Sequence, residues 1–352
     1  MSLLKASRVF KPMQYPEAFE HWKVHDRMVW HWDEVPLADD VADFNRADAE
    51  EKEFITEVMR LFTQNDVEVG HGYDVLLRIF KPTEVSMMLR GNADRESTHI
   101  AAYSLFTETL GFPDEFYSEF LDDELMSEKI EFVEEAQVKK YEEYSADFAG
   151  KHPKVLGSGE GEYINDATWY KARRDYIDYR YKQDIIFMLA VYATVTEGVS
   201  LFAQFAMLLK YQTDNKYKGL GTIVEWSIKD EEQHVVSNSW LLRTFISENP
   251  EVFDDNIKKR VYDAVRDIVQ KEEDLVDRLN PPHMDNDTVK QYIRYIADQR
   301  LKLIGFKSNW NIPTNPLPFM EDLTGTVLTN FFEGKVTEYS KSSLQGDWNG
   351  IK

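Results

Sequence analysis

Cysteine is absent from this chain of 352 residues. Its absence excludes disulfide bonds, thiolate metal sites and cysteine nucleophiles, and it favours a reducing compartment, the cytoplasm. Basic residues are also fewer than acidic ones. The chain has 41 Lys and Arg residues and 63 Asp and Glu residues, which gives a formal net charge of −22. We therefore expect binding neither to nucleic acid nor to anionic membranes, since both require basic side chains.

Long apolar runs are scarce. The longest apolar stretch, 185–195, has about half the length of a membrane span, and Glu197 and Gln204 interrupt its continuation. The first 25 residues mix charged and aromatic side chains and contain no apolar signal segment. We expect no membrane-spanning segment and interpret 185–195 as part of a buried helix.

Proline is absent between Pro153 and Pro250, and alternating β-branched runs are rare along the whole chain. These features predict an all-α protein. No clear linker divides 1–335, which we interpret as one helical domain. Within it, 1–46 is expected to wrap the bundle as an arm with little regular structure. The polar, Gly- and Ser-rich segment 336–352 is expected to be a flexible tail.

The expected helices follow from apolar periodicity and from the positions of proline. One of them needs a break or a distortion, because Thr, Gly and Ser surround Glu197 and form helices weakly. The helices are expected over 47–69, 82–110, 114–146, 163–212 (two helices or a distorted one), 216–247, 251–278 and 286–306.

Two of these helices carry the spacing Glu-x-x-His, as Glu96 with His99 and Glu231 with His234. Residues three apart share one helix face, so each pair can offer a carboxylate and an imidazole to the same point. Tyr103 follows His99 by four positions and should project to the same interior. A tyrosine used only for packing is the alternative interpretation.

A third pair has the same spacing, Glu68 with His71. In a chain this acidic, about one or two such spacings are expected by chance, so a single pair carries no weight. This one contains Gly70 and is followed by Gly72, which indicates the end of a helix. We interpret it as unrelated to a site.

Two further acids are candidates for the same site. Glu197 is the only acid between Asp184 and Asp214, and it lies in an apolar run. A buried, unpaired carboxylate costs several kcal/mol, so Glu197 needs a cation, a proton or hydrogen bonds. On the first long helix, an inward stripe ends at Asp66, whereas Glu68 shares a solvated face with other polar residues.

Helices that bring two Glu-x-x-His pairs together with one acid from each of two more helices form the known two-metal carboxylate site of helix bundles. The pattern therefore predicts oxygen or redox chemistry at a buried dinuclear centre beside an oxidisable phenol. Asp230 could hydrogen-bond the free ring nitrogen of a ligand histidine, although an ordinary surface aspartate is the alternative.

The order of these residues resembles the radical-generating small subunit of class I ribonucleotide reductase, a member of the ferritin-like dimetal-carboxylate superfamily. The interval of 34 positions from Glu197 to Glu231 is typical of that family. Two flanking segments add to the resemblance, which runs from about residue 28 to 341. They are the segment from Trp30 to the Val-Pro-Leu at 35–37, and the Asn-Phe-Phe-Glu box at 330–333 with Tyr339 after it.

The resemblance implies a role for each matching residue. Two metal ions per chain, iron or manganese, would react with dioxygen, and Tyr103 would hold the stored radical. Trp30, Asp230 and His99 would form the inner part of a relay that Tyr339 extends to a separate large subunit. The chain would be a homodimer, and its tail would bind the large subunit, which holds the ribonucleotide. The metal ligands would be Asp66, Glu96 and His99 for one ion and Glu197, Glu231 and His234 for the other, with Glu96 and Glu231 able to bridge.

A dry, apolar pocket should protect such a radical, and Leu201, Phe205 and Ile228 are its expected lining, on the stripes of the Glu197 and Glu231 ligands. One departure from the family is the interval from Asp66 to the first Glu-x-x-His, which is one residue shorter than usual; we expect a loop near 70–82 to absorb it. The alternative functions are a metal-storing ferroxidase and a stand-alone diiron oxygenase.

Overall fold

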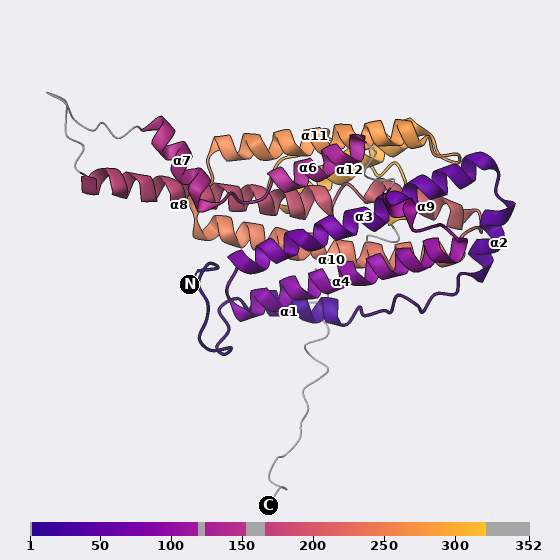
Figure 1. Cartoon of the computed structure of the whole chain (residues 1–352), viewed down its shortest axis with the longest axis horizontal. Coiled ribbons are helices and arrows are strands. Elements are labelled where there is room, and N and C mark those ends of the chain that lie inside the picture. Colours follow the sequence, from indigo (N-terminus) through magenta and orange to yellow (C-terminus); the bar gives the residue numbers. More distant parts are fainter. Residues whose placement is uncertain (1, 119–123, 153–165, 322–352) are drawn as a thin grey trace, which may run out of the picture.

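The computed structural model describes residues 2–118, 124–152 and 166–321. Within these ranges the chain forms helices and no strand, which confirms the expected all-α class (Figure 1). The predicted tail, the box at 330–333 and Tyr339 lie outside the described residues. No described helix combines the length and the apolar character that crossing a membrane requires.

Long helices run side by side and enclose the core (Figure 1). The helix α10 is central to the packing, since it contacts α4, α8, α9 and α12. The helices 82–110, 216–247, 251–278 and 286–306 are confirmed with small shifts at their ends. The bundle consists of α3 (Ala49–Ile79), α4 (Thr83–Leu110), α8 (Asp166–Ala190), α9 (Phe202–Thr213), α10 (Lys218–Glu248), α11 (Asp255–Leu279) and α12 (Asn286–Leu303).

The N-terminal arm is more regular than expected. It contains α1 (Pro16–Asp26), which packs on α4 and α10, and α2 (Ala38–Arg46). The Asp40 carboxylate of α2 accepts the backbone N–H groups of Gly219 and Leu220 in the first turn of α10. An anion at this end of a helix satisfies amides that have no partner within the helix. The prediction of little regular structure was wrong because these long-range contacts stabilise short helices.

The helix α3 does not end at its glycines, so the boundary predicted at 69 was wrong. It continues for ten more residues to Ile79, and only Phe80–Pro82 separate it from α4. Gly72 serves close packing instead: a Cβ there would lie 2.0 Å from the ring of Tyr192. The loop expected near 70–82 is therefore reduced to Phe80–Pro82, the three residues between the two helices.

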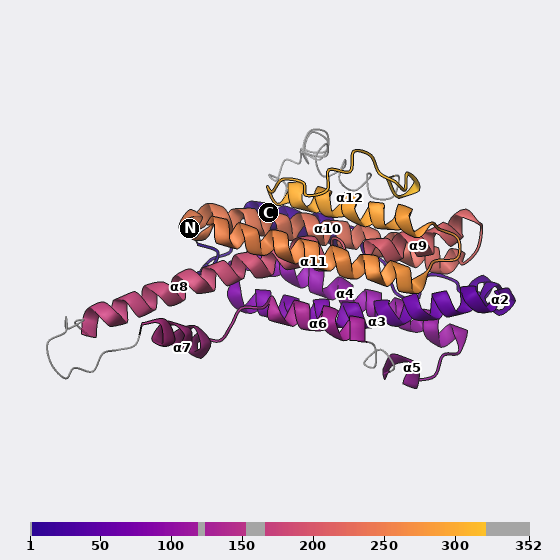
Figure 2. The same ribbon diagram turned by 90° about the horizontal axis from the view of Figure 1, so that it is seen from above.

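The single helix predicted over 114–146 was also wrong. The chain there forms α5 (Glu115–Ser118), α6 (Glu124–Glu135) and α7 (Tyr141–Lys151). The helix α6 ends in a turn after Glu135. The next helix, α7, begins where the Glu143 carboxylate accepts the backbone N–H of Lys140. Figure 2 shows α7 beside the part of α8 that extends beyond the bundle.

The stretch 163–212 is distorted as predicted. After α8 the helix widens into a π segment, Val191–Thr196, and α9 begins at Phe202. The π segment ends directly before Glu197, which keeps its backbone in the helical region. Such widened turns are frequent at functional sites, because they re-aim the side chains that follow. A short 3-10 helix, Pro250–Val252, joins α10 to α11.

Candidate metal centre

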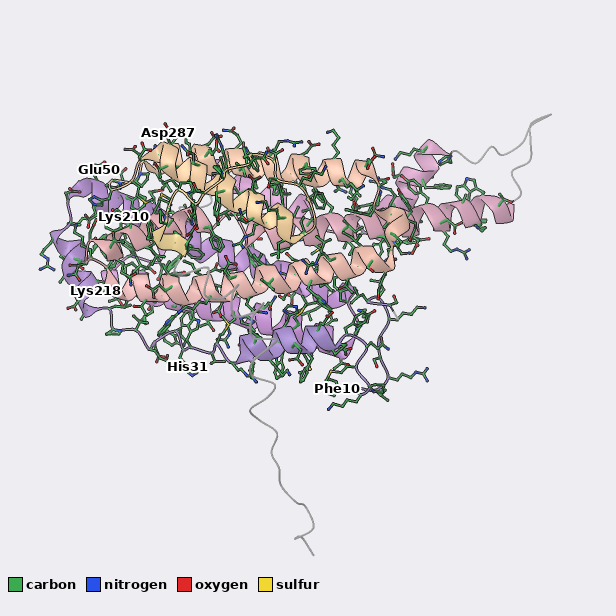
Figure 3. The ribbon with its side chains drawn as sticks, turned by 180° about the vertical axis from the view of Figure 1, so that it is seen from behind. Phe10, His31, Glu50, Lys210, Lys218 and Asp287 are labelled. Carbon is green, nitrogen blue, oxygen red and sulfur yellow. The ribbon has the colours of Figure 1, made fainter. Side chains whose placement is uncertain are left out.

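Six acidic and imidazole side chains meet in the middle of the bundle, all of them at most 2% exposed. They come from α3, α4, the turn after the π segment, and α10. Charged residues such as Glu50, Lys218 and Asp287 instead lie at the outside of the bundle (Figure 3). The side chains brought together are those expected from the sequence: Asp66, Glu96, His99, Glu197, Glu231 and His234.

The six residues form two overlapping groups, each able to hold a metal ion. Asp66 and His99 belong to the first group, and Glu197 and His234 to the second. Both groups also contain Glu96 and Glu231, and the ligand atoms within each group lie within 4.8 Å of one another. The two shared carboxylates have the placement that bridging ligands need. The choice of Asp66 over Glu68 agrees with this geometry.

The imidazoles point their Nδ1 atoms at the carboxylates. For His99, Nδ1 lies 3.3 Å from Glu231 Oε1 and 3.6 Å from Glu96 Oε2. For His234, Nδ1 lies 3.0 Å from Glu96 Oε1 and 3.4 Å from both Glu197 Oε1 and Glu231 Oε2. Two nitrogens and several oxygens thus face one small volume, as in the carboxylate and imidazole sites that bind iron and manganese.

The cluster is short of positive charge. Its four carboxylates exceed its two imidazoles by two charges even when both rings are protonated. Several of its buried atoms also make no hydrogen bond of acceptable geometry to a described residue, although other ligand atoms of the cluster lie close to them, and such atoms are costly unless a cation or water meets them. They are Asp66 Oδ2, Glu96 Oε1, both carboxylate oxygens of Glu231, and Nδ1 and Nε2 of His234. Two divalent cations would balance the four carboxylates, so the donor set fits a dinuclear site.

Burial and mutual contact shift the protonation of these groups. Burial raises the pKa of Asp66 well above its usual range and raises the pKa of Glu197 to about 7. Burial would do the same to Glu96, but the imidazoles beside it lower its pKa to about 2. Burial alone would lower the pKa values of His99 and His234, yet the surrounding carboxylates raise both well above their usual range. Protons therefore occupy this site at neutral pH, and bound cations would displace them.

Tyr103 lies in a closed aromatic pocket. Its hydroxyl donates a 2.8 Å hydrogen bond to Ser227 Oγ, and its ring stacks on Phe62 with the centroids 4.9 Å apart. Phe62 in turn stacks on Phe205 at 5.2 Å. Burial raises the pKa of the Tyr103 phenol, so it keeps its proton. Ser227 and the direct stacking partner Phe62 were not assigned from the sequence.

The three residues expected to line this pocket are all buried in the core. Phe205 reaches Tyr103 through Phe62, as the second ring of a stack. Leu201 and Ile228 belong to the same hydrophobic core. The stacking partner of the phenol, Phe62, and its hydrogen-bond partner, Ser227, come from α3 and α10.

Asp230 connects the arm to the metal cluster. Its Oδ2 accepts a 2.8 Å hydrogen bond from Trp30 Nε1 and lies 3.2 Å from His99 Nε2. The rings of Trp30 and His99 also stack, with centroids 5.9 Å apart. Asp230 is fully buried, so the surface-aspartate alternative is excluded. Although burial opposes it, contacts with His25 and His99 lower the pKa of Asp230 and keep it charged.

Four polar neighbours of the site escaped the sequence reasoning. From α1, His25 Nε2 lies 3.2 Å from Asp230 Oδ1. Around Glu197, hydrogen bonds come from Tyr73 and Asn238, and Asn92 supports Tyr73. A signal existed for two of them: Tyr73 follows Asp66 by seven positions, and Asn238 follows His234 by four, so each shares a helix face with a ligand candidate. No local spacing could have indicated His25.

The pair that we set aside lies at the surface. The side chain of His71 is 67% exposed and its Nδ1 lies 3.8 Å from Glu68 Oε2. Its spacing is the same as that of the two buried pairs, but it faces away from the core. The interpretation as a chance occurrence agrees with this placement, although the helix does not end there.

Comparisons with known proteins agree with this geometry. Residues 7–316 match the family model for the ribonucleotide reductase small chain. This chain belongs to the ribonucleotide reductase small-chain family. It is 36% identical to a probable ribonucleoside-diphosphate reductase small subunit of Invertebrate iridescent virus 6, an alignment that covers 100% of this chain and 99% of the relative.

Solved structures of this family share the fold of the small subunit described here. The ribonucleotide reductase R2 subunit of Clostridium botulinum matches with a TM-score of 0.72 at 17% identity, over 92% of this chain and 94% of that one. The dimanganese(II) protein NrdF of Streptococcus sanguinis matches with a TM-score of 0.69 at 18% identity, over 91% and 99%. The predicted ferritin-like fold and the predicted function as a small subunit, which works with a large subunit, are confirmed.

Proposed function

We propose that this small subunit holds two metal ions in the buried cluster and stores an oxidising equivalent as a radical on Tyr103. The observation that carries the proposal is the pair of overlapping ligand groups with Glu96 and Glu231 in common. The assigned ligands are Asp66, Glu96 and His99 for one ion and Glu197, Glu231 and His234 for the other. The storage and stand-alone oxygenase alternatives lack support from the family match.

Iron is the metal we expect, with manganese as the alternative, because hard oxygen ligands and imidazole suit both. Two such ions, when bound and reduced, would supply electrons to dioxygen and so provide the oxidising power that a phenol requires. The chain itself provides the rigid cage. Three helices and the turn at Glu197 hold the ligand atoms of each group within 4.8 Å of one another, so the cluster needs little rearrangement on binding.

With two oxidised ions bound in the cluster, Tyr103 would give up one electron to them and its hydroxyl proton to a carboxylate of the cluster, such as Asp66, whose charge acts on the phenol. Ser227 Oγ already accepts a hydrogen bond from that hydroxyl, so it orients the O–H bond. The stacked rings of Phe62 and Phe205 keep water from the phenol. A radical on Tyr103 would be protected because the side chain is only 1% exposed and is packed against aromatic rings.

The contacts of Asp230 suggest the route by which the radical leaves. An electron could pass between the stacked Trp30 and His99 rings, while Asp230 holds the indole proton at Nε1. We assign Tyr339 as the next carrier, on a tail that binds the large subunit. The same proposal includes a homodimer of this chain. It also includes a cytoplasmic location, which the absence of cysteine favours.

Electron paramagnetic resonance tests the proposal directly. The protein is loaded anaerobically with Fe(II), exposed to oxygen and frozen, and the same is done with Mn(II) and an oxidant. We expect a narrow phenoxyl signal that Tyr103→Phe abolishes and Tyr211→Phe leaves in place, since the Tyr211 hydroxyl is buried elsewhere in the core. Metal uptake with no radical under either metal would overturn the assignment of Tyr103.

A further inference from the structure

A second tyrosine, Tyr73, contacts the second ligand group of the cluster. It is fully buried on α3, and its hydroxyl donates a 2.5 Å hydrogen bond to Glu197 Oε1. Its ring meets that of His234 edge-on, with centroids 5.9 Å apart. Tyr73 therefore touches both residues that distinguish the second ligand group from the first.

The direction of the Tyr73 O–H bond is fixed by its neighbours. A phenol has one proton to donate and lone pairs that accept. The Nδ2 groups of Asn92 and Asn238 donate to the Tyr73 oxygen at 3.2 Å and 3.0 Å. With its acceptor capacity used by two amides, the hydroxyl must direct its proton at Glu197.

The carboxylate of Glu197 is held at both ends. Tyr73 donates to Oε1, and Asn238 Nδ2 donates to Oε2 at 2.9 Å. Because Asn238 also donates to Tyr73, the three side chains close a triangle. Asn92 is held in turn through its 3.1 Å hydrogen bond to Ser237 Oγ. Rotation of the carboxylate out of this position would break two buried hydrogen bonds at once.

We propose that Tyr73 is a positioning residue for the second metal ion, which acts by fixing the carboxylate of Glu197. The hydroxyl holds one lone pair of Oε1, so Glu197 presents a limited and constant set of lone pairs to the cation it shares with His234. The inference rests on the proposed function, because it takes Glu197 as a ligand. It extends that function by separating the two ions, since Tyr73 acts on one of them.

Packing of the Tyr73 ring in the core does not by itself explain the hydrogen bonds of its hydroxyl. Tyr292 is another fully buried tyrosine, and its hydroxyl has no hydrogen-bond partner among the described side chains. Tyr292 therefore shows that packing a tyrosine in this core does not require such a network. It supplies a matched control, since Tyr73→Phe and Tyr292→Phe each remove a single buried oxygen atom.

Anaerobic Mn(II) titration calorimetry of the full chain tests the proposal, with the Mn(II) resonance spectrum recorded on the same samples. Removing a hydrogen-bond partner of a ligand weakens metal binding about 10- to 100-fold. We expect Tyr73→Phe to weaken one of two Mn(II) sites by this factor, to leave the other within about twofold, and to change the spectrum of the coupled pair. Tyr292→Phe should match the wild type in both measurements.

The outcomes separate this inference from the proposed function. If the wild type binds two Mn(II) ions and Tyr73→Phe binds both with unchanged affinity and spectrum, the positioning role is wrong and the metal site stands. If Tyr73→Phe weakens both sites equally together with a lower melting temperature of the metal-free protein, the role is structural and the inference also fails. If the wild type itself binds fewer than two ions, the proposed function falls first.

Discussion

Trp30 donates a 2.8 Å hydrogen bond from its indole Nε1 to Asp230 Oδ2, across 200 positions of sequence. The bond joins the N-terminal arm to α10, one residue before the ligand candidate Glu231. Asp230 also lies 3.2 Å from His99 Nε2. A single carboxylate therefore links the buried indole of the N-terminal arm to the metal cluster through direct contacts of 2.8 Å and 3.2 Å.

Replacing Trp30 by Phe should uncouple the radical from turnover. The indole N–H is lost, so Asp230 can no longer hold the migrating proton, while the metal ligands and Tyr103 stay in place. We expect normal metal content and a normal phenoxyl signal, but no detectable ribonucleotide reduction with the large subunit. Asp230 Oδ2 keeps its contact with His99 Nε2, and the loss of the buried hydrogen bond from the indole should lower the free energy of unfolding by about 1–3 kcal/mol.

Trp240→Phe is the control for that variant. It also removes an indole hydrogen bond, the 2.9 Å bond to Glu17 Oε2, but Trp240 lies ten positions along α10 from Asp230, nearly three helical turns away. Turnover should survive in this variant. Equal turnover in Trp30→Phe and the wild type would refute the relay.

The two kinds of Glu-x-x-His pair give a matched comparison for metal binding. His99 is buried with Nδ1 facing two carboxylates, whereas His71 has the same spacing at the surface. We expect His99→Ala to bind at most one Mn(II) ion with high affinity and His71→Ala to bind two, as measured by equilibrium dialysis and metal analysis. Loss of an ion in His71→Ala, or full binding in His99→Ala, would show that the burial argument chose the wrong pair.

Metal binding should become tighter as the pH rises. Burial raises the pKa of Glu197 to about 7, so its carboxyl is largely protonated at pH 6 and ionised at pH 8. A cation must displace that proton, and the fraction of sites ready to bind grows as pH passes the pKa. From Glu197 alone, the apparent Mn(II) affinity should increase about tenfold between pH 6 and pH 8. Calorimetry at both pH values measures it, and a pH-independent affinity would contradict the raised pKa.

Deleting 336–352 should separate radical formation from catalysis. The deletion leaves the ligands and Tyr103 untouched, so metal content and the phenoxyl signal should equal those of the full chain. It removes Tyr339 and the segment we assign to large-subunit binding, so ribonucleotide reduction should stop. Tyr339→Phe distinguishes the loss of the radical carrier from the loss of large-subunit binding, since this variant lacks the Tyr339 hydroxyl but should still bind the large subunit in a pull-down assay. Undiminished turnover after the deletion would end the proposed role of the tail.

Most of the site could be predicted from the sequence because helical periodicity is local. Spacings of three and four positions place Glu96, His99 and Tyr103 on one face whatever surrounds the helix. The choice of Asp66 over Glu68 followed from the same periodicity, and the buried position of Asp66 agrees with it.

What could not be predicted depends on how distant elements pack. His25 reaches Asp230 only because α1 packs against α4 and α10, and no spacing within 1–46 encodes that contact. Gly70 and Gly72 carry a local signal to end a helix, but close packing of Gly72 against Tyr192 outweighs it and α3 continues. The closed hydrogen-bond triangle at Glu197 likewise joins α3 to α10. Helical spacing could therefore indicate Tyr73 and Asn238 separately, but not the hydrogen bonds between them.

Anomalous diffraction at the metal absorption edge, from crystals loaded with Mn(II) or Fe(II), tests the central claim most directly. We predict two peaks per chain inside the bundle. One would lie between Asp66 and His99 and the other between Glu197 and His234, with Glu96 and Glu231 reaching both. A single peak, or peaks away from these six side chains, would contradict the account.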